Sequence, residues 1–338
     1  MLTKKIYFTA PGVAELMEET VAPPGTGEVQ VRLCVSTISS GTERANLIGD
    51  ANVRSDRPAG KVTWPRSGGY SSAGIVEAVG EGVHDIAVGD RVALSWSKHT
   101  QRINMPRKGV HKLPDELPFA AAALLHIGTF PLAAIRKCRI ELGESAIVMG
   151  MGVLGLLALP LLRAAGAAPI IAVDPMAEKR EKALACGADF ALDPTADGFA
   201  ERVKELTDGG AKVGIEVTGV GAGLNGILDC MARYGRVALL GCTRNSDFTV
   251  DYYRKVHGPG ITLIGAHTDA RPKAESHGGW FTEADDVAAM IRLHQLGRLD
   301  FAALVDEIHS PAEAPEVYHR LATERAFPIV QFDWEKTV

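Results

Sequence analysis

The stretch that decides the fold is "IVMGMGVLGLLALPLLRAAGAAPIIAVD", residues 147–174. It has the pattern of a short apolar strand, a glycine-rich turn, an apolar helix and a second strand that ends in an acid. Gly150, Gly152 and Gly155 form G-x-G-x-x-G. The first glycine permits a tight turn, the second lets the backbone approach a pyrophosphate, and the third lets helix and strand pack closely. Because the helix N-terminus also offers free N–H groups to phosphate oxygens, the stretch predicts a dinucleotide-binding βαβ unit.

Asp174 selects the dinucleotide. It ends the second strand about 20 residues after the glycines, where a carboxylate accepts both ribose hydroxyls of NAD and repels the 2′-phosphate of NADP. We therefore expect NAD(H). Lys179 and Arg180 follow one turn later, and their positive charges could allow NADP to bind. The simpler interpretation is that both residues lie on a solvated helix face. The residues that we predict to bind the cofactor are Gly150, Gly152, Val153, Leu154, Gly155, Asp174, Lys179, Thr218, Gly241 and His267.

Length and composition narrow the class of protein. The chain has 338 residues, of which 46% are hydrophobic, and this favours two domains. A formal net charge of -5 gives no bulk attraction to nucleic acid or to an anionic membrane. No apolar window reaches the length of a membrane span, so we expect a cytoplasmic protein that acts on small molecules. The five cysteines are scattered without a CxxC pair, which argues against a disulfide framework and against a cysteine-rich zinc lobe.

The pattern of the chain changes near Phe119. Before it, residues 28–39 and 74–94 alternate or form short β-branched runs between glycine turns, which is typical of a small barrel or sandwich. After it, helical stretches rich in Ala and Leu alternate with apolar strands, which indicates a parallel sheet. The strands that we expect are "SAIVMG" (145–150), "PIIAVD" (169–174), "ADFAL" (188–192), "VGIEV" (213–217), "RVALLG" (236–241) and "ITLIGAH" (261–267).

The last part of the chain returns to mixed structure. Residues 268–280, "TDARPKAESHGGW", predict an exposed, mobile loop. A helix follows over residues 282–297, with Thr282 and Asp285 placed to cap its start. Residues 305–333 predict a strand, a helix and a final strand.

These features together resemble the medium-chain dehydrogenase/reductase superfamily over nearly the whole chain. The stretches that carry the resemblance are the glycine pattern and residues 27–43, 72–94, 111–135, 215–241 and 261–267. The resemblance implies an α/β protein in which a GroES-like β-rich catalytic domain, residues 1–118 and 269–338, surrounds a Rossmann doubly wound parallel sheet, residues 119–268. It places the active site in the cleft between the domains. The element "ISSGTER" (38–44) further resembles a subgroup of bacteriochlorophyllide dehydrogenases and sugar or polyol dehydrogenase-like proteins.

The chain departs from the superfamily where zinc members carry ligands. Ser40 stands at the position of a ligand cysteine, Tyr70 at that of a histidine and Ser71 at that of a glutamate. Hydroxyls are poor ligands for an ion that prefers thiolate and imidazole. The structural zinc lobe is missing too, because residues 95–115 contain no cysteine. We therefore expect no metal.

Without a metal, hydroxyl and imidazole groups must move the proton of an alcohol or polarise a ketone. The resemblance places Thr42 at a relay hydroxyl and Glu43 at the carboxylate that orients the ligand histidine, so we expect Glu43 to face Tyr70. A phenol beside a carboxylate is oriented as a donor, although Tyr70 could also be a plug that fills the vacated metal position. Ser40 completes the predicted catalytic group.

His126, in "LLHIGTF", is the histidine best placed by sequence to be a proton shuttle, although a lone histidine in an apolar run is often a core residue. His267 could line the pocket, whereas His99 and His111 are expected at the surface. Trp64, Trp96 and Trp280 could stack on a sugar ring or belong to the core. Glu43 and His126 could also hold an ion with waters, but two such ligands make a poor metal site.

We thus expect a zinc-independent, NAD(H)-dependent oxidoreductase that interconverts a secondary alcohol and a ketone on a polar substrate such as a sugar, polyol or glycoside. One alternative is an NAD(P)H-dependent quinone or enone C=C reductase. A second is redox-neutral epimerisation or elimination with retained NAD, and a third is a non-enzymatic NAD-binding role. The resemblance also implies a homodimer formed through edge strands of the Rossmann sheet.

Overall fold

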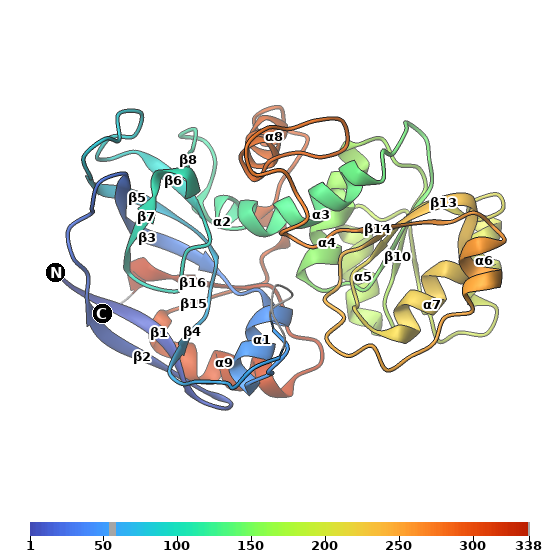
Figure 1. Ribbon diagram of the computed structural model, residues 1–338, viewed down its shortest axis with the longest axis horizontal. Coiled ribbons are helices and arrows are strands. Elements are labelled where there is room, and N and C mark those ends of the chain that lie inside the picture. The colour runs from blue at the N-terminus through green and yellow to red at the C-terminus, as the bar shows by residue number, and fades with distance from the viewer. Residues whose placement is uncertain (54–58, 337–338) are drawn as a thin grey trace. The chain divides into compact units, whose positions relative to one another are not determined.

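The computed structural model describes residues 1–53 and 59–336, which divide into two compact units. The first contains residues 1–127 and 300–338, and the second residues 128–299. Figure 1 traces the elements of both along the chain. The first unit is built from both ends of the chain. Its boundaries differ from the predicted domains, because residues 119–127 belong to the first unit and 269–299 to the second.

The first unit is rich in β-structure. Its larger sheet has the order β15-β16-β3-β5-β6-β8, with β7 paired to β3, and the smaller sheet has the order β2-β1-β4. The larger sheet contains β3 (Glu28–Thr37), β5 (Ser71–Val79), β6 (Arg91–Ser95), β7 (Arg102–Pro106), β8 (Val110–Lys112), β15 (Glu307–His309) and β16 (Val330–Asp333). The smaller sheet contains β1 (Leu2–Ala10), β2 (Val13–Thr20) and β4 (Arg66–Ser67). Alternate residues such as Val29, Val31 and Leu33 are buried, as the period of a strand requires.

Three helices accompany these sheets: α1 (Ser40–Ile48), α2 (Phe119–Ala122) and α9 (Ala314–Thr323). In α9, Ala314, Val317, Tyr318 and Leu321 are buried, which is the i, i+3, i+4, i+7 spacing of one helix face. This face brings Tyr318 into the core, where its ring packs edge-on against Phe8 at 4.9 Å between centroids. The C-terminal helix therefore brings a polar hydroxyl into the interior of the first unit.

The second unit contains a six-stranded parallel sheet in the order β11-β10-β9-β12-β13-β14. The strands are β9 (Ala146–Met149), β10 (Ile170–Val173), β11 (Phe190–Leu192), β12 (Ala211–Glu216), β13 (Met231–Leu239) and β14 (Thr262–Gly265). All six predicted strands are confirmed. Numbered within the sheet, the order is 3-2-1-4-5-6, which is that of the Rossmann fold and places the switch of direction between β9 and β12.

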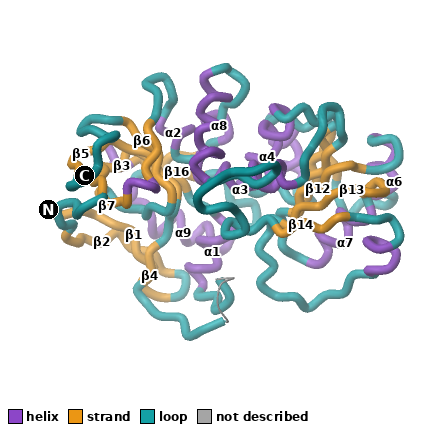
Figure 2. Tube along the Cα trace, turned by 45° about the horizontal axis from the view of Figure 1, so that its top comes forward, coloured by secondary structure: helices purple, strands orange, loops and turns teal. Residues whose placement is uncertain are grey.

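The helices of this sheet are α4 (Val153–Ala164), α5 (Ala177–Ala185), α6 (Phe199–Leu206) and α7 (Gly221–Asp229), and α3 (Leu125–Lys137) precedes them. Helices α4 and α7 lie on opposite sides of the sheet (Figure 2). This follows from right-handed crossovers, because the connections from β9 to β10 and from β12 to β13 run in opposite directions across the sheet.

Residues 268–280 are less exposed than the sequence predicted. The Arg271 side chain is only 4% exposed, because its guanidinium lies 3.4 Å from the Asp286 carboxylate and donates to the carbonyl of Thr129 at 2.9 Å. Asp286 lies in α8 (Glu283–Gln295) and is also bound by Arg136 of α3 at 2.7 Å. This buried ion cluster explains why residues 269–299 belong to the second unit. The predicted start of α8 is confirmed, since the Thr282 side chain accepts from the backbone N–H of Asp285.

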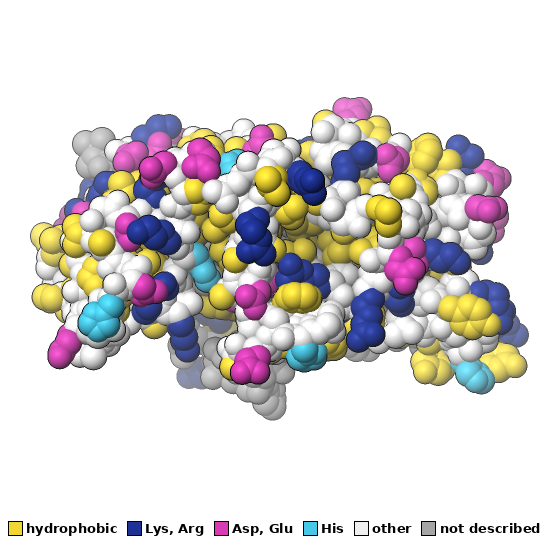
Figure 3. Space-filling model, turned by 90° about the horizontal axis from the view of Figure 1, so that it is seen from above, with side chains coloured by type: hydrophobic (Ala, Val, Ile, Leu, Met, Phe, Trp, Pro, Cys, Tyr) yellow, Lys and Arg dark blue, Asp and Glu magenta, His cyan; other side chains and the backbone are white. Residues whose placement is uncertain are grey.

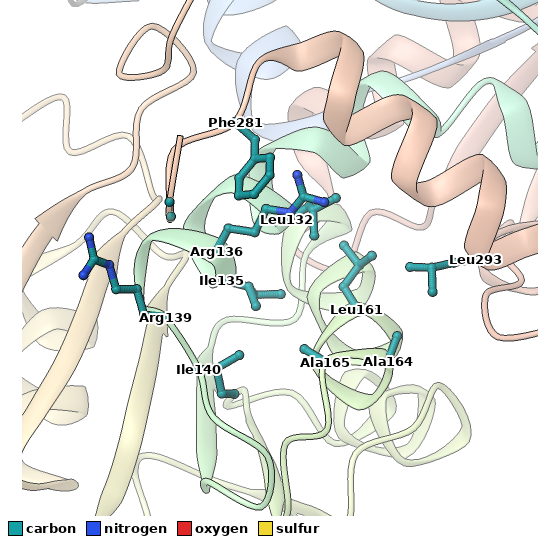
Figure 4. A pocket seen from close by; sticks show the side chains of 12 residues that line it. Leu132, Ile135, Arg136, Arg139, Ile140, Leu161, Ala164, Ala165, Phe281 and Leu293 are labelled. Carbon is teal, nitrogen blue, oxygen red and sulfur yellow. The ribbon is translucent and has the colours of Figure 1, made fainter. Parts of the chain in front are cut away.

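The second unit also has an apolar cavity of about 600 Å³. Figure 4 shows its lining, which comes from α3, α4 and α8 and from residues 139, 140, 165, 278, 279 and 281. None of the predicted site residues lines it. On the surface face in Figure 3, positive and negative side chains are interspersed. Among the helices of the described ranges 1–53 and 59–336, none has the length and apolar character of a membrane span.

Candidate functional site

The glycine-rich turn joins β9 to α4. Gly150 has φ +102°, a backbone conformation that favours glycine. A Cβ on Gly155 would lie 1.9 Å from the Gly150 carbonyl oxygen, so only glycine allows helix and turn to pack this closely. Gly152 is the N-cap of α4, and a Cβ there would meet no atom of the chain within 4 Å. The open space at Gly152, before the free N–H groups of Val153 and Leu154, fits a pyrophosphate.

Asp174 lies immediately after β10 and is buried. One carboxylate oxygen accepts from the backbone N–H of Met151 at 2.9 Å and the other from that of Met176 at 3.0 Å. The acid is thereby fixed beside the glycine turn. Arg180 donates to the Asp174 carbonyl at 2.8 Å and pairs with Asp193 at 3.1 Å, while Lys179 is half-buried in α5.

Three further predicted cofactor residues follow the other strands. Thr218 comes after β12, and its methyl group is the atom that a Cβ on Gly150 would meet, at 2.9 Å. A Cβ on Gly241, after β13, would lie 2.3 Å from the backbone nitrogen of Gly219. His267, after β14, is partly exposed, and its Nδ1 accepts from the backbone N–H of Asp269 at 3.2 Å.

Glu216 was missed by the sequence analysis. Its buried carboxylate at the end of β12 accepts from the backbone N–H of Thr218 at 2.8 Å, from the Thr218 hydroxyl and from the N–H of Gly219. Burial raises the pKa of Glu216 above its ordinary value. Glu216 thus holds the turn at Thr218 and Gly219 through their backbone N–H groups, just as Asp174 holds the backbone N–H of Met151 in the glycine turn. The signal available in the sequence was the same in both cases, namely an acid at the end of a parallel strand.

In the first unit, the expected contact between Glu43 and Tyr70 is wrong. The Glu43 carboxylate instead lies 3.0 Å from His99 Nε2 and accepts a hydrogen bond from the Tyr318 hydroxyl. It also accepts from the backbone N–H of Ser39 at 2.8 Å. The carboxylate is drawn into the core because helix α1 places Glu43 on its buried face, with Ala45 and Leu47.

The prediction that His99 lies at the surface is also wrong, because the side chain is fully buried. Its Nδ1 lies 2.7 Å from Ser36 Oγ, which in turn accepts from Trp334 Nε1 at 2.8 Å. His111 is half-buried, with Nε2 at 3.0 Å from Ser95 Oγ. A buried histidine with polar neighbours on both ring nitrogens is a structural member of the core.

The glycines of "SGGY" make room for this polar network. A Cβ on Gly68 would lie 2.9 Å from a Glu43 carboxylate oxygen, and one on Gly69 would lie 2.7 Å from the backbone nitrogen of His99. Gly69 also has φ +82°. The chain can therefore pass close over Glu43 and His99 before it reaches Tyr70.

Tyr70, Trp96 and His126 form a cluster of three rings. The ring centroids of Tyr70 and His126 are 5.6 Å apart, and those of Trp96 and His126 are 4.6 Å apart. The Tyr70 hydroxyl donates to Ser39 Oγ. The structure thus brings together the two strongest predicted proton-transfer residues, Tyr70 and His126, and Ser39 contacts both Tyr70 and Glu43.

The positions that carry zinc ligands in related enzymes do not fit a zinc ion here. Ser71 Oγ donates to the Ala123 carbonyl at 2.6 Å, and the Tyr70 hydroxyl is directed to Ser39. Ser40 and Thr42 are half-buried in the first turn of α1. Zinc prefers thiolate and imidazole ligands, and the three ligand positions, Ser40, Tyr70 and Ser71, supply only hydroxyls. Within the part of the chain that the structure describes, no three side chains of His, Cys, Asp or Glu are grouped so as to hold a metal.

Fold and site together define a dehydrogenase with a GroES-like domain and a Rossmann domain. Residues 26–130 match the family "Alcohol dehydrogenase GroES-like domain", and residues 153–275 match "Zinc-binding dehydrogenase". An (R,R)-butanediol dehydrogenase of Bacillus subtilis is 31% identical, over 61% of this chain and 67% of that protein. The chain belongs to the medium-chain dehydrogenase/reductase superfamily, as an alcohol dehydrogenase-type enzyme that uses a nicotinamide cofactor.

Other relatives cover more of the chain. A D-guloside 3-dehydrogenase of Escherichia coli is 26% identical over 93% of this chain and 95% of that protein. The solved structure of benzyl alcohol dehydrogenase from Acinetobacter calcoaceticus superposes with a TM-score of 0.83 and covers 98% of this chain and 99% of that one. At 20% identity, the latter shows the fold alone.

Proposed function

We propose that the protein is an NAD(H)-dependent, zinc-independent oxidoreductase that interconverts a secondary alcohol and a ketone on a polar substrate, of the sugar, polyol or glycoside class. The observation that carries the proposal is the grouping of Tyr70, which stands at a ligand position of the zinc members, with Ser39 and His126. The likeness of "ISSGTER" to the sugar and polyol subgroup points the same way.

Asp174 supports NAD over NADP. Its two oxygens are held by backbone N–H groups and retain further lone pairs for the ribose hydroxyls. A 2′-phosphate would place a second negative group beside this buried acid. Arg180 does not offset that repulsion freely, because its guanidinium is already bound to Asp193 and to the Asp174 carbonyl.

When bound, NAD supplies the hydride acceptor at C4 of the nicotinamide. Residues of the chain then bind the substrate oxygen and take up its proton. When substrate binds, the Tyr70 phenol turns its hydrogen from Ser39 Oγ to the substrate oxygen and stabilises the charge that develops there, while the Ser39 hydroxyl donates to the phenol oxygen in return. His126 takes up the alcohol proton, since imidazole titrates nearest neutrality. In ketone reduction the same two groups act in reverse. Ser39 positions Tyr70, and Glu43 positions Ser39.

The substrate class draws on the relatives as well as on the site. The butanediol, D-guloside 3- and L-threonine 3-dehydrogenases are named for substrates that carry a secondary hydroxyl. Ser39, Ser40, Thr42 and Tyr70 give the first unit a group of hydroxyls suited to a polar substrate. The Ser71 hydroxyl does not belong to this group, because it donates to the Ala123 carbonyl.

The test measures NADH absorbance with polyols, methyl glycosides and simple diols, after prolonged chelation and again after zinc is added back. We expect turnover of a polar secondary alcohol that survives chelation. Loss of activity with chelator and recovery with zinc would overturn the zinc-free mechanism. Copurified NAD without net NADH would favour a redox-neutral reaction, and NADPH-dependent enone reduction alone would favour the C=C reductase.

Tyr70→Phe separates a catalytic donor from a plug. The ring and its contacts with Trp96 and His126 remain, while the hydroxyl that reaches Ser39 is lost. Loss of a general acid–base or oxyanion donor costs about 10²-fold or more in kcat. We therefore expect kcat of Tyr70→Phe to fall by about that factor while its affinity for NAD stays unchanged. The matched control is Tyr234→Phe, because Tyr234 is an exposed side chain of the second unit. Retained turnover in Tyr70→Phe would make Tyr70 a plug.

A further inference from the structure

Trp96 is the one exposed tryptophan of the four in the chain, all of which the structure describes. Its side chain is 51% exposed, whereas Trp334 is buried and Trp64 and Trp280 are half-buried. The half of this large apolar ring that stays at the surface gains nothing from burial in the folded chain. Such a residue beside a catalytic group is a candidate for contact with a ligand.

The backbone of Trp96 is strained. It has φ +65°, a conformation that bulky residues seldom adopt and that persists only when other contacts enforce it. The residue follows β6 directly, and its backbone N–H donates to the carbonyl of Tyr70 at 2.8 Å. This hydrogen bond holds Trp96 beside Tyr70, the residue that we propose as the hydrogen-bond donor to the substrate oxygen.

The indole is also held by its neighbours. Its ring centroid lies 4.6 Å from that of His126, at an interplanar angle of 68°, and 5.9 Å from that of Tyr70, at 42°. These contacts orient the ring while half of its surface stays in solvent. A fixed, exposed aromatic face loses little conformational entropy when a ligand packs on it.

We propose that the exposed indole of Trp96 stacks on the C–H face of a pyranose ring, so that the substrate is a cyclic sugar or glycoside rather than an acyclic polyol. A pyranose presents a continuous apolar face to an aromatic ring and hydroxyls at its edge to Tyr70. A short acyclic diol covers too little of the indole to gain from it. This inference rests on the proposed oxidoreductase function and selects one class within it.

The kinetic test compares Trp96→Phe and Trp96→Asn with wild-type enzyme on methyl pyranosides and on 2,3-butanediol. Asn accepts the left-handed backbone, so this variant removes the ring without adding strain. Because aromatic contacts are worth about 0.5–1.5 kcal/mol, we expect KM for the pyranoside to rise about two- to tenfold in Trp96→Asn, and less in Trp96→Phe. KM for butanediol should stay within twofold. Equal effects on both substrates would overturn the inference.

A second measurement is independent of turnover. Methyl pyranosides should change the tryptophan fluorescence of the wild type and of the control Trp280→Phe, whose indole lies over Lys137 in the second unit. The change should vanish in Trp96→Phe. If it persists there, Trp96 is not the stacking residue. If pyranosides alter Trp96 fluorescence but no alcohol is oxidised, the stacking site stands and the proposed oxidoreductase function fails.

Discussion

One oxygen of the Glu43 carboxylate lies 3.0 Å from His99 Nε2, and both side chains are buried in the first unit. The same carboxylate binds the backbone of Ser39, whose hydroxyl accepts from Tyr70. In the superfamily pattern this acid orients a metal ligand. In this structure Glu43 instead accepts a hydrogen bond from the backbone N–H of Ser39 and so holds that serine in place. The influence of Glu43 on Tyr70 therefore passes through the N-terminus of helix α1.

Tyr318→Phe tests how much this network contributes to stability. Burial and the nearby Glu43 raise the pKa of Tyr318 well above its ordinary value, so the phenol stays protonated and donates to the carboxylate. Hydrogen bonds to buried charges contribute about 1.5–3 kcal/mol. We expect the free energy of unfolding in urea to fall by that amount. Tyr234→Phe, at an exposed site, should change it by less than about 0.5 kcal/mol. Equal values for the two variants would contradict the network.

The two glycines before and inside α4 should respond differently to alanine. In Gly155→Ala the Cβ would meet the Gly150 oxygen at 1.9 Å, so both thermal stability and NAD affinity should fall. In Gly152→Ala the new methyl meets no atom of the chain within 4 Å, so the melting temperature should stay while NAD affinity falls about tenfold or more, through lost approach to the pyrophosphate.

Gly278→Ala is the control for both, because its Cβ would also meet nothing within 4 Å and it lies outside the turn. Calorimetry and NAD titration give the two readouts. Unchanged NAD affinity in Gly152→Ala would place the pyrophosphate elsewhere.

Asp286 predicts a pH dependence of stability. Burial raises the pKa of this carboxyl to about 7, against the opposing pull of Arg136 and Arg271. The folded state then binds a proton more tightly than the unfolded chain, in which the pKa is near 3.8. Stability from this group is therefore full below about pH 4 and declines as the pH rises towards 7.

Urea unfolding of wild type and Asp286→Asn between pH 4 and 7 measures this effect. We expect the wild type to lose stability relative to the variant as the pH rises. Asp208→Asn is the control, because Asp208 is exposed and Asn accepts its positive φ. A relative gain in wild-type stability would mean that the two guanidiniums dominate over burial.

We propose that the protein is a homodimer formed through β14, one of the two edge strands of the parallel sheet. Leu263 in this strand is 38% exposed, and an unpaired strand edge is a template for pairing with a second copy. Leu263→Asp should convert dimer to monomer in sedimentation experiments. Leu142→Asp replaces a more exposed leucine away from the strand and should leave the dimer intact. A monomeric wild type would end the proposal.

The second unit was predictable because its signals are local. Strand, glycine turn, helix and terminal acid follow one another within residues 147–174, and each has a distinct pattern. The site in the first unit depends on distant pairings. His99 lies in the polar stretch "SKHTQR" and shows no sign of burial in the sequence, yet its neighbour Thr100 pairs with Lys5 and fixes it inside the fold.

Tyr318 illustrates the same limit. Its helix was expected from periodicity, but its bond to Glu43 joins residues 275 positions apart. Tyr70 and His126 were both candidates from their residue types and their places in the superfamily pattern. That their rings meet, with Trp96 beside them, required the tertiary structure.

The two backbone bonds of Asp174 have a consequence for engineering cofactor preference. The oxygen that accepts from Met151 ties the acid to the glycine turn, so the side chain that we propose selects the ribose also anchors that turn. A residue without a side-chain acceptor, such as alanine, introduced to admit NADP would therefore also release the turn. Cofactor exchange in this enzyme therefore needs a replacement, such as asparagine or serine, that restores an acceptor for the Met151 N–H, together with a cation that Asp193 does not already hold.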